Sequence, residues 1–140
     1  MELEIENIIN KTEQDINMMP PLVWAYIGDC VYELFIRTYL VEKTKFKPHK
    51  LHIEATKYVK ASAQANIVHI ISKELEESEL DIIRRGRNAE NHHVAKNATI
   101  IDYAYSTGFE ALIGFLYLQN KNDRLNKILN RSIEIIERGE

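Results

Sequence analysis

Three observations predict an all-α fold for this sequence. Apolar residues recur at helical spacing over most of the 140 residues, and no segment shows the two-residue alternation of a half-buried strand. The three prolines stand at Pro20, Pro21 and Pro48, so nothing after residue 48 forbids helix formation. We therefore expect five or six helices packed as a bundle.

Two long helices are predicted in the first half of the chain. Pro20 and Pro21 suit the start of a helix, and residues 22–41 follow as one helix that is apolar on most sides. A helix of that kind is expected to be central and buried. Pro48 opens a second helix, which keeps helical spacing to about Ser72 with most of its lysines on the opposite face.

The second half predicts three more helices. A short helix runs from Glu76 to about Arg85 and ends at Gly86, a residue common just past a helix C-terminus. Residues 86–97 have no sustained apolar period and are expected to form an exposed loop or a frayed turn. A further apolar helix is expected over residues 98–118. A final amphipathic helix follows a turn at residues 120–122, with its apolar face at Leu125, Ile128, Leu129, Ile133 and Ile136.

The composition predicts one domain spanning residues 1–140. With 45% apolar and 28% charged residues, a chain of this length can bury a core without disulfides. The lone cysteine, Cys30, excludes an intramolecular disulfide and favours a reducing cytosol. The N-terminus is acidic, and no segment reaches the roughly 18 consecutive apolar residues of a membrane span. We therefore expect an intracellular protein with no membrane partner.

Positive charge is concentrated in two places although the net charge is −3. Residues 43–60 carry six lysines against the single acid Glu54. Such runs are either solvated faces or surfaces for an anionic partner, because binding follows the local potential and not the total. A second basic cluster follows at Arg84, Arg85, Arg87 and Lys96.

Two acids stand out because each lies in an otherwise apolar helix with a glycine nearby. Asp29 follows Gly28 in AYIGDCVYE, and Glu110 precedes Gly114 by one turn in TGFEALIGFLYL. A buried, unpaired carboxylate is costly, so each acid is expected to be hydrogen-bonded, ion-paired or bound to a metal. Two carboxylates on facing helices suit Mg²⁺ or Mn²⁺, whereas the alternative is a pair of unrelated structural acids.

Other potentially reactive side chains give weaker patterns. Glu33 shares the face of Asp29 and is either a ligand-supporting group or an ion-pair partner. Cys30 lies in apolar sequence with no nearby base, which predicts a buried thiol. His49 and His52 have helical spacing but lack a third ligand of zinc-site spacing.

The order and spacing of these motifs resemble the ribonuclease III family. AYIGDCVYELF resembles the signature helix of its endonuclease domain, and EALIGFLYL resembles its second acidic motif. Between them, HIEATKYVKASAQA and IIRRGRNA are similar to the Mini-III group, which has the catalytic domain without a double-stranded-RNA-binding domain. The resemblance covers residues 18–130 or so and implies a helical endonuclease domain.

The resemblance implies roles for the two acids. Asp29 matches the essential metal-associated aspartate of the family and Glu110 its metal-ligating glutamate, with Mg²⁺ as the cofactor and Mn²⁺ as a substitute. Leu22, Ala25 and Thr107 stand where full-length ribonuclease III has further carboxylates, a reduced set that Mini-III sequences share. The implied reaction is metal-assisted hydrolysis of double-stranded RNA that leaves 5′-phosphate ends.

The resemblance also implies partners. A homodimer is expected, with part of the apolar helix at the interface. Leu22, Trp24 and Phe35 are candidate contacts, and the alternative for each of them is the core of the single chain. The implied substrate is a 23S ribosomal RNA precursor stem in a bacterial cytoplasm, with a ribosomal protein as a further potential partner. Because duplex RNA is recognised largely through its backbone, the candidate RNA-binding residues are Lys57, Lys60, Arg84, Arg85, Arg87 and Asn88.

Two rival interpretations stay open at the level of sequence. The missing carboxylates suggest a non-catalytic, dimeric RNA-binding module of the same fold. Alternatively, the chain is a helical interaction protein whose acids are structural. Asp29→Asn distinguishes these rivals, because only an enzyme loses turnover while it still binds RNA.

Overall fold

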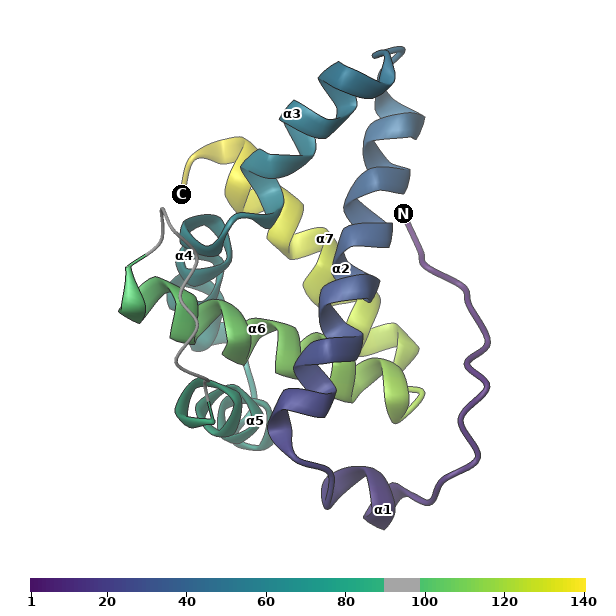
Figure 1. Ribbon diagram of the computed structural model, residues 1–140, viewed down its shortest axis with the longest axis vertical. Helices are drawn as coiled ribbons and strands as arrows, with labels where there is room; N and C mark the ends of the chain where they lie inside the picture. Colours follow the sequence, from purple (N-terminus) through teal and green to yellow (C-terminus); the bar gives the residue numbers. More distant parts are fainter. Residues whose placement is uncertain (90–98) are drawn as a thin grey trace.

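Helices alone form the regular structure of the computed structural model, which describes residues 1–89 and 99–140 (Figure 1). The all-α prediction is confirmed, and no strand occurs in these two ranges. Within them lie seven α-helices and one 3₁₀ helix. They are α1 (Glu13–Asn17), α2 (Pro21–Lys43), α3 (Pro48–Val59), α4 (Ala61–Ile71), η1 (Ser72–Glu74), α5 (Glu77–Asn88), α6 (Ile100–Leu118) and α7 (Asn122–Arg138).

Helix α6 is the central element, with α2, α4, α5 and α7 packed around it (Figure 1). Its core-facing residues Phe109, Leu112 and Ile113 are fully buried. From α2, Trp24 and Phe35 are equally buried, and the Trp24 indole Nε1–H donates to the carbonyl of Ile16 in α1 at 2.9 Å. The long apolar helix is therefore central, as the sequence predicts.

The predicted second helix is interrupted, which corrects one sequence-based expectation. Lys60 is extended (φ −62°, ψ 154°) and separates α3 from α4. The two carbonyl groups just before the break accept hydrogen bonds from side chains instead of the next helical turn. Tyr32 donates to the carbonyl of Tyr58 at 2.9 Å, and Gln64 donates to that of Val59 at 2.8 Å.

Gly86 does not end a helix, which corrects a second expectation. Helix α5 continues through it to Asn88, so the predicted loop is wrong at residues 86–88, while residues 90–97 lie outside the described ranges. A Cβ atom at Gly86 would lie 2.7 Å from Ala111 Cβ and 3.0 Å from Gly108 Cα. This glycine is explained by close packing of α5 on α6.

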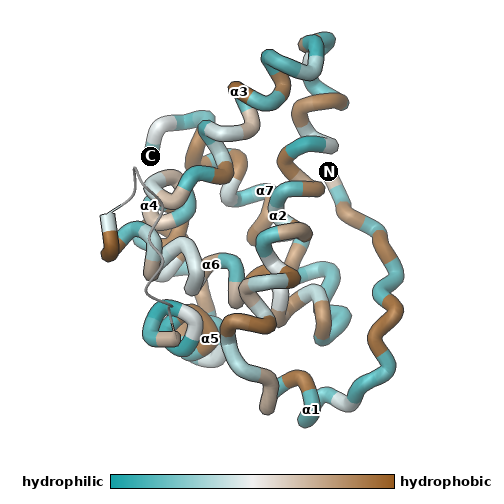
Figure 2. The backbone as a smooth tube through the Cα atoms, viewed as in Figure 1, coloured by the Kyte–Doolittle hydropathy of each residue, from teal (hydrophilic) through white to brown (hydrophobic). Residues whose placement is uncertain are grey.

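The N-terminal segment, residues 1–12, runs as extended chain from α7 to the short helix α1 (Figure 1). Figure 2 shows apolar and polar residues interspersed along it. Leu3 N–H donates to Asn126 Oδ1 at 2.6 Å, and Asn7 Nδ2 donates to the carbonyl of Tyr117 at 2.8 Å. In the described ranges, no helix combines the length and hydropathy needed to cross a membrane.

Candidate active site

The crossing of α2 and α6 is a contact between two backbones. A Cβ atom added to Gly28 would lie 2.8 Å from the Gly114 nitrogen and closer still to the carbonyl oxygen of Glu110. A Cβ atom on Gly114 would lie 2.8 Å from the Gly28 nitrogen and closer still to the carbonyl oxygen of Trp24. Only glycine fits at either position without parting the helices.

This crossing brings the predicted carboxylates together. Asp29 follows Gly28 on α2, and the backbone of Glu110 on α6 lies against Gly28. Burial, followed by the charge and hydrogen bonding of the neighbouring Asp29, raises the pKa of Glu110 to about 8. Two carboxylates from facing helices therefore share one small region, as their sequence pattern predicts.

Asp29 is exposed, contrary to the expectation of a buried acid. Cys30 beside it is also exposed, so the prediction of a buried thiol is wrong as well. The apolar side chains of α2 that enter the core lie on its other side, and this face of the helix is uncovered in the single chain. The pair of acids thus combines a mostly covered carboxyl with one that faces solvent.

Glu33 lies one turn after Asp29 and contributes to the local negative charge. Its charge is a minor cause of the raised pKa of Glu110. Its carboxylate accepts a hydrogen bond from Arg37 Nε at 2.9 Å. Glu33 is therefore close to the site, yet it already has a cationic partner.

Gln64 is a residue of this site that the sequence analysis missed. Its side chain lies on α4, which packs on α6, and only 3% of the residue is exposed. Gln64 acts to lower the pKa of Glu110 against the effects of burial and Asp29, and its own Nε2 donates to the carbonyl of Val59 at 2.8 Å. A polar residue within the buried run Ala63–Ala65 was the available sequence signal.

The donor set of the site fits a hard divalent cation. Across residues 1–89 and 99–140, no group of three or more histidine, cysteine, aspartate or glutamate side chains has the arrangement of a metal site. Two carboxylates are nevertheless enough for Mg²⁺, which keeps several waters and uses substrate phosphate oxygens as ligands. A cation would also offset the repulsion between Asp29 and Glu110 that raises the pKa of Glu110.

The predicted RNA-binding residues fall into two groups, on α3 and on α5, which lie on opposite sides of α6 in Figure 1. In the first group, Lys57 Nζ pairs with Glu54 at 3.1 Å, and Lys60 is exposed at the junction of α3 and α4. The ion pair of Lys57 lies at the surface and costs little to exchange for a phosphate.

The second group lies on α5 and is partly engaged by aromatic rings. Arg85 lies over the ring of Trp24, 4.8 Å from its centroid, and Arg84 pairs with Asp81 at 2.9 Å. Arg87 and Asn88 are joined by a hydrogen bond from Arg87 Nε to Asn88 Oδ1 at 3.3 Å. Arg87 also lies 5.4 Å from the centroid of the Tyr105 ring.

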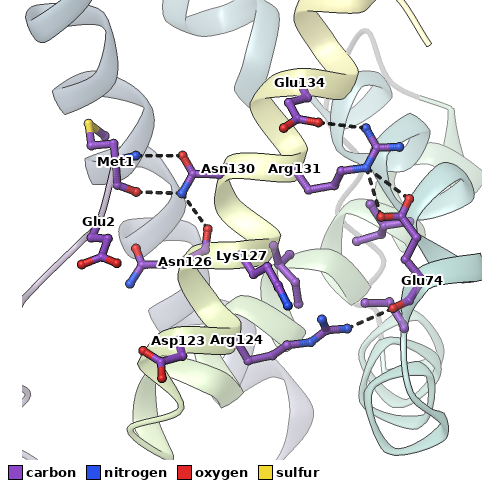
Figure 3. A pocket seen from close by; sticks show the side chains of 13 residues that line it. Met1, Glu2, Glu74, Asp123, Arg124, Asn126, Lys127, Asn130, Arg131 and Glu134 are labelled. Atoms are coloured by element: carbon purple, nitrogen blue, oxygen red, sulfur yellow. Dashed lines mark hydrogen bonds and ion pairs between the residues drawn. The ribbon is translucent and has the colours of Figure 1, made fainter.

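A pocket of about 730 Å³ lies away from the two carboxylates, between α7, η1 and the N-terminus (Figure 3). Two of the arginines that line it contact Glu74. Arg131 Nε contacts both carboxylate oxygens of Glu74 at 3.1 Å, and Arg124 donates to the carbonyl of Glu74 at 3.1 Å. The charged groups that line the pocket are therefore in part engaged with one another.

The expected dimer contacts on α2 need correction. Trp24 and Phe35 are wholly buried within the chain, because both belong to the core, and Leu22 is only half-buried. A different row of apolar side chains is uncovered along α2. It consists of Val23, Tyr26, Leu34 and Val41, of which Tyr26 is 76% exposed.

Comparison with known proteins gives a consistent result. The Ribonuclease III domain model matches residues 22–121. A Mini-ribonuclease 3 of Clostridium tetani is 48% identical over 127 residues, covering 90% of this chain and 84% of the relative. One of Staphylococcus aureus is 42% identical over 129 residues, covering 91% and 96%. A crystal structure of a Fusobacterium nucleatum protein has a TM-score of 0.76 at 30% identity, covering 86% and 96%.

Proposed function

Because the chain belongs to the Mini-ribonuclease 3 group of the ribonuclease III family and is an endoribonuclease acting on double-stranded RNA, we propose that Asp29 and Glu110 form its catalytic centre. The glycine crossing of α2 and α6 carries this proposal, because it sets the two acids side by side. Asp29 faces solvent, so an RNA backbone can reach the pair without a change in the fold.

Asp29 and Glu110 would hold Mg²⁺, with Mn²⁺ as a substitute. When bound, the metal supplies an activated water for in-line attack on the phosphodiester and stabilises charge on the leaving oxygen. The chain itself supplies two carboxylates held by a rigid crossing and a covered environment around Glu110 that strengthens electrostatic contacts. Glu33, already paired with Arg37, supports the site from one turn away.

The two basic groups bind duplex RNA through its phosphates. Lys57 and Lys60 serve on one side of α6, and Arg84, Arg85, Arg87 and Asn88 serve on the other. A second copy of the chain doubles this surface. We assign the dimer contact to the uncovered row of α2 that contains Tyr26 and Leu34, because apolar side chains in a row are typical of an interface.

The biological substrate we propose is the stem of a 23S ribosomal RNA precursor in a bacterial cytoplasm. The group resemblance supports this choice, and the relatives compared above are bacterial. Residues 1–140 would act as one catalytic domain, and a ribosomal protein is a candidate for presenting the RNA. These assignments call for tests on the natural precursor.

A gel cleavage assay tests the catalytic centre. A plain RNA duplex and a 23S precursor stem are incubated with Mg²⁺ or EDTA, using wild type, Asp29→Asn and Glu110→Gln. Both variants are expected to lose cleavage by a factor of about 10³ or more while they bind RNA normally. Asp123→Asn, an exposed acid on α7, is the matched control and should cleave like wild type.

Several outcomes would overturn the proposal. Cleavage by Asp29→Asn at the wild-type rate would exclude Asp29 from the catalytic centre. Cleavage in EDTA would exclude a requirement for a divalent metal. Binding without cleavage by the wild type would favour the non-catalytic RNA-binding module. Glu110→Gln has a second readout, because burial raises the pKa of Glu110. A neutral side chain there is expected to raise the Tm of the metal-free protein at pH 8.

A further inference from the structure

We propose that Glu137 is a positioning residue for RNA binding, because it holds in place the helix that carries Lys57 and the junction that carries Lys60. This inference rests on the proposed role of the two lysines and extends it to a residue near the end of α7. The juxtaposition that carries it is a single carboxylate oxygen on α7 that accepts hydrogen bonds from two tyrosines, one on α2 and one on α3.

Helix α3 is thinly packed. Of its 12 residues, only Ala55 and Tyr58 are buried. Figure 1 shows the helix at one end of the bundle, beside α2 and away from α5. An element with so few buried contacts is held mainly by the attachments of those few side chains. The position of α3 therefore depends on Tyr58.

Tyr58 is attached to the rest of the fold at three points. Its hydroxyl donates to Glu137 Oε2 at 3.0 Å. Its backbone carbonyl accepts a hydrogen bond from the Tyr32 hydroxyl at 2.9 Å. Its ring meets that of Tyr39 edge to face, with the centroids 6.3 Å apart. Two of these attachments lead to α2 and one leads to α7.

Glu137 joins the attachments into one cluster. The Tyr39 hydroxyl donates to the same Oε2 atom at 2.5 Å. Hydrogen bonds to an ionised carboxylate are shorter and stronger than those between neutral groups. We call the cluster of Tyr39, Tyr58 and Glu137 the tyrosine clasp. It connects α2, α3 and α7 through one oxygen atom, and Glu137 itself is exposed, so its replacement leaves the core intact.

The tyrosine clasp lies next to the proposed RNA-binding lysines of this region. Lys57 directly precedes Tyr58, and Lys60 follows it by two residues. On α2, Tyr32 lies three residues after Asp29. Holding α3 against α2 therefore fixes where the lysines lie relative to the proposed catalytic acid. Lysines on a fixed helix lose less freedom on binding a phosphate than lysines on a mobile one, so the clasp favours RNA binding.

Electrostatics alone predicts the opposite effect for the loss of Glu137. Removing a negative charge strengthens the attraction of an RNA backbone, so weaker binding cannot be a consequence of the charge change. Glu134→Leu is the matched control, because it removes the same residue type from the same helix one turn earlier. The ion pairs of Glu134 are with Arg131 and Arg138, both on α7 itself.

The test measures kcat and KM for a plain duplex and the Tm of the full chain. For Glu137→Leu we expect KM to rise roughly 5–10-fold while kcat stays at the wild-type value. Glu137→Gln keeps an acceptor oxygen and should restore most of the loss. Glu134→Leu should bind RNA at least as tightly as wild type. A lower Tm with an unchanged KM indicates a purely structural cluster and would overturn the proposal.

A combination of variants tests whether Glu137 acts through the lysines. Adding Glu137→Leu to a protein that carries Lys57→Ala and Lys60→Ala should raise KM no further, because residues that act through a shared group are not additive. A second rise of the same size would contradict the inference. Tyr58→Phe removes the hydroxyl and keeps the ring, and it replaces Glu137→Leu if that protein does not fold. It should raise KM in the same way, and a wild-type KM would overturn the role of the clasp.

The same variants separate this inference from the proposed function. If the protein with both lysines replaced binds RNA like wild type, the proposed RNA-binding role of Lys57 and Lys60 fails, and the inference fails with it. If that protein binds weakly and Glu137→Leu binds like wild type, only the role of Glu137 fails. Asp29→Asn reports on the catalytic centre independently of both.

Discussion

Replacing Gly114 with alanine would place a methyl group inside the contact between α2 and α6. The new Cβ atom would lie 2.7 Å from the carbonyl carbon of Trp24 and closer still to its oxygen. Ordinary contact begins at 3.4 Å, so the helices must part by more than about 0.7 Å. Both neighbours are backbone atoms, and a rotamer change cannot relieve the clash.

The cost follows from that separation. A gap of about 0.5–1 Å forfeits a quarter to a half of the dispersion energy between facing atoms, and this interface includes the edge-to-face contact of Trp24 with Phe115. Overpacking of this kind costs roughly 1–3 kcal/mol, and more when the backbone must move. Alanine is more favourable than glycine in the middle of a helix by about 1 kcal/mol, which offsets part of this cost. Taking the upper end of that range, we expect a net loss of about 2 kcal/mol in the free energy of unfolding, or a Tm lower by roughly 7 °C.

Urea unfolding of Gly114→Ala and Gly28→Ala measures this loss, with the duplex cleavage rate as a second readout. Because the crossing sets the spacing of the two acids, the folded fraction should also cleave about 100-fold more slowly. Gly139→Ala is the matched control: no atom lies within 4 Å of its added Cβ, so it should cost only about 1 kcal/mol for its left-handed backbone (φ 66°) and spare activity. A Gly114→Ala protein as stable as wild type would refute the reasoning.

Three further predictions concern pH, salt and assembly. Burial acts to raise the pKa of Glu79, but hydrogen bonds from Arg124 and from the Glu76 backbone hold it below its usual value. The stabilisation of the folded state by ionised Glu79 is therefore present above about pH 4.5 and is lost as the pH falls through the lowered pKa. Glu79→Gln should cost about 2 kcal/mol at pH 7 and flatten the acid side of a Tm-against-pH curve, whereas an unchanged acid slope would contradict it. Lys60→Ala should weaken RNA binding and reduce the slope of log K against log salt by about 1 at unchanged kcat, and an unchanged slope would exclude a phosphate contact. Tyr26→Glu should convert a dimer to monomers in sedimentation, and a retained dimer would place the interface elsewhere.

Most of the fold could be predicted, because the spacing of apolar residues and the positions of the prolines indicate where the helices lie. The predicted helix over residues 22–41 is observed as α2, and that over residues 98–118 as α6. The short helix α1 was missed, because five residues hold too few turns for a periodic signal. Its capping box, Thr12 with Asp15, was the local evidence available.

The break at Lys60 could not be predicted, because residues around it keep helical spacing. The end of α3 is stabilised by side-chain hydrogen bonds to its last two carbonyl groups. One comes from Tyr32 on α2 and the other from Gln64 on α4. Gly86 was misjudged for a similar reason. A glycine that permits close helix packing and one that ends a helix look alike in sequence.

At the candidate site, the pairing of Asp29 with Glu110 was predictable because each acid lies near a glycine on an apolar helix. The exposure of Asp29 was not, because an apolar neighbourhood in sequence does not say which side of a helix faces the core. Gln64 escaped notice since its importance depends on α4 packing against α6. The catalytic and RNA-binding roles remain predictions for the experiments above.

The glycine crossing has a consequence for how this protein tolerates change. The closest approach of α2 and α6 is set by backbone contact at Gly28 and Gly114, so removing atoms from Phe109 or Leu112 cannot bring the helices nearer. Large-to-small substitutions in the core can therefore alter stability while the spacing of the two acids stays constant. Engineers can vary thermal tolerance and reaction geometry separately, provided that these two positions keep their glycines.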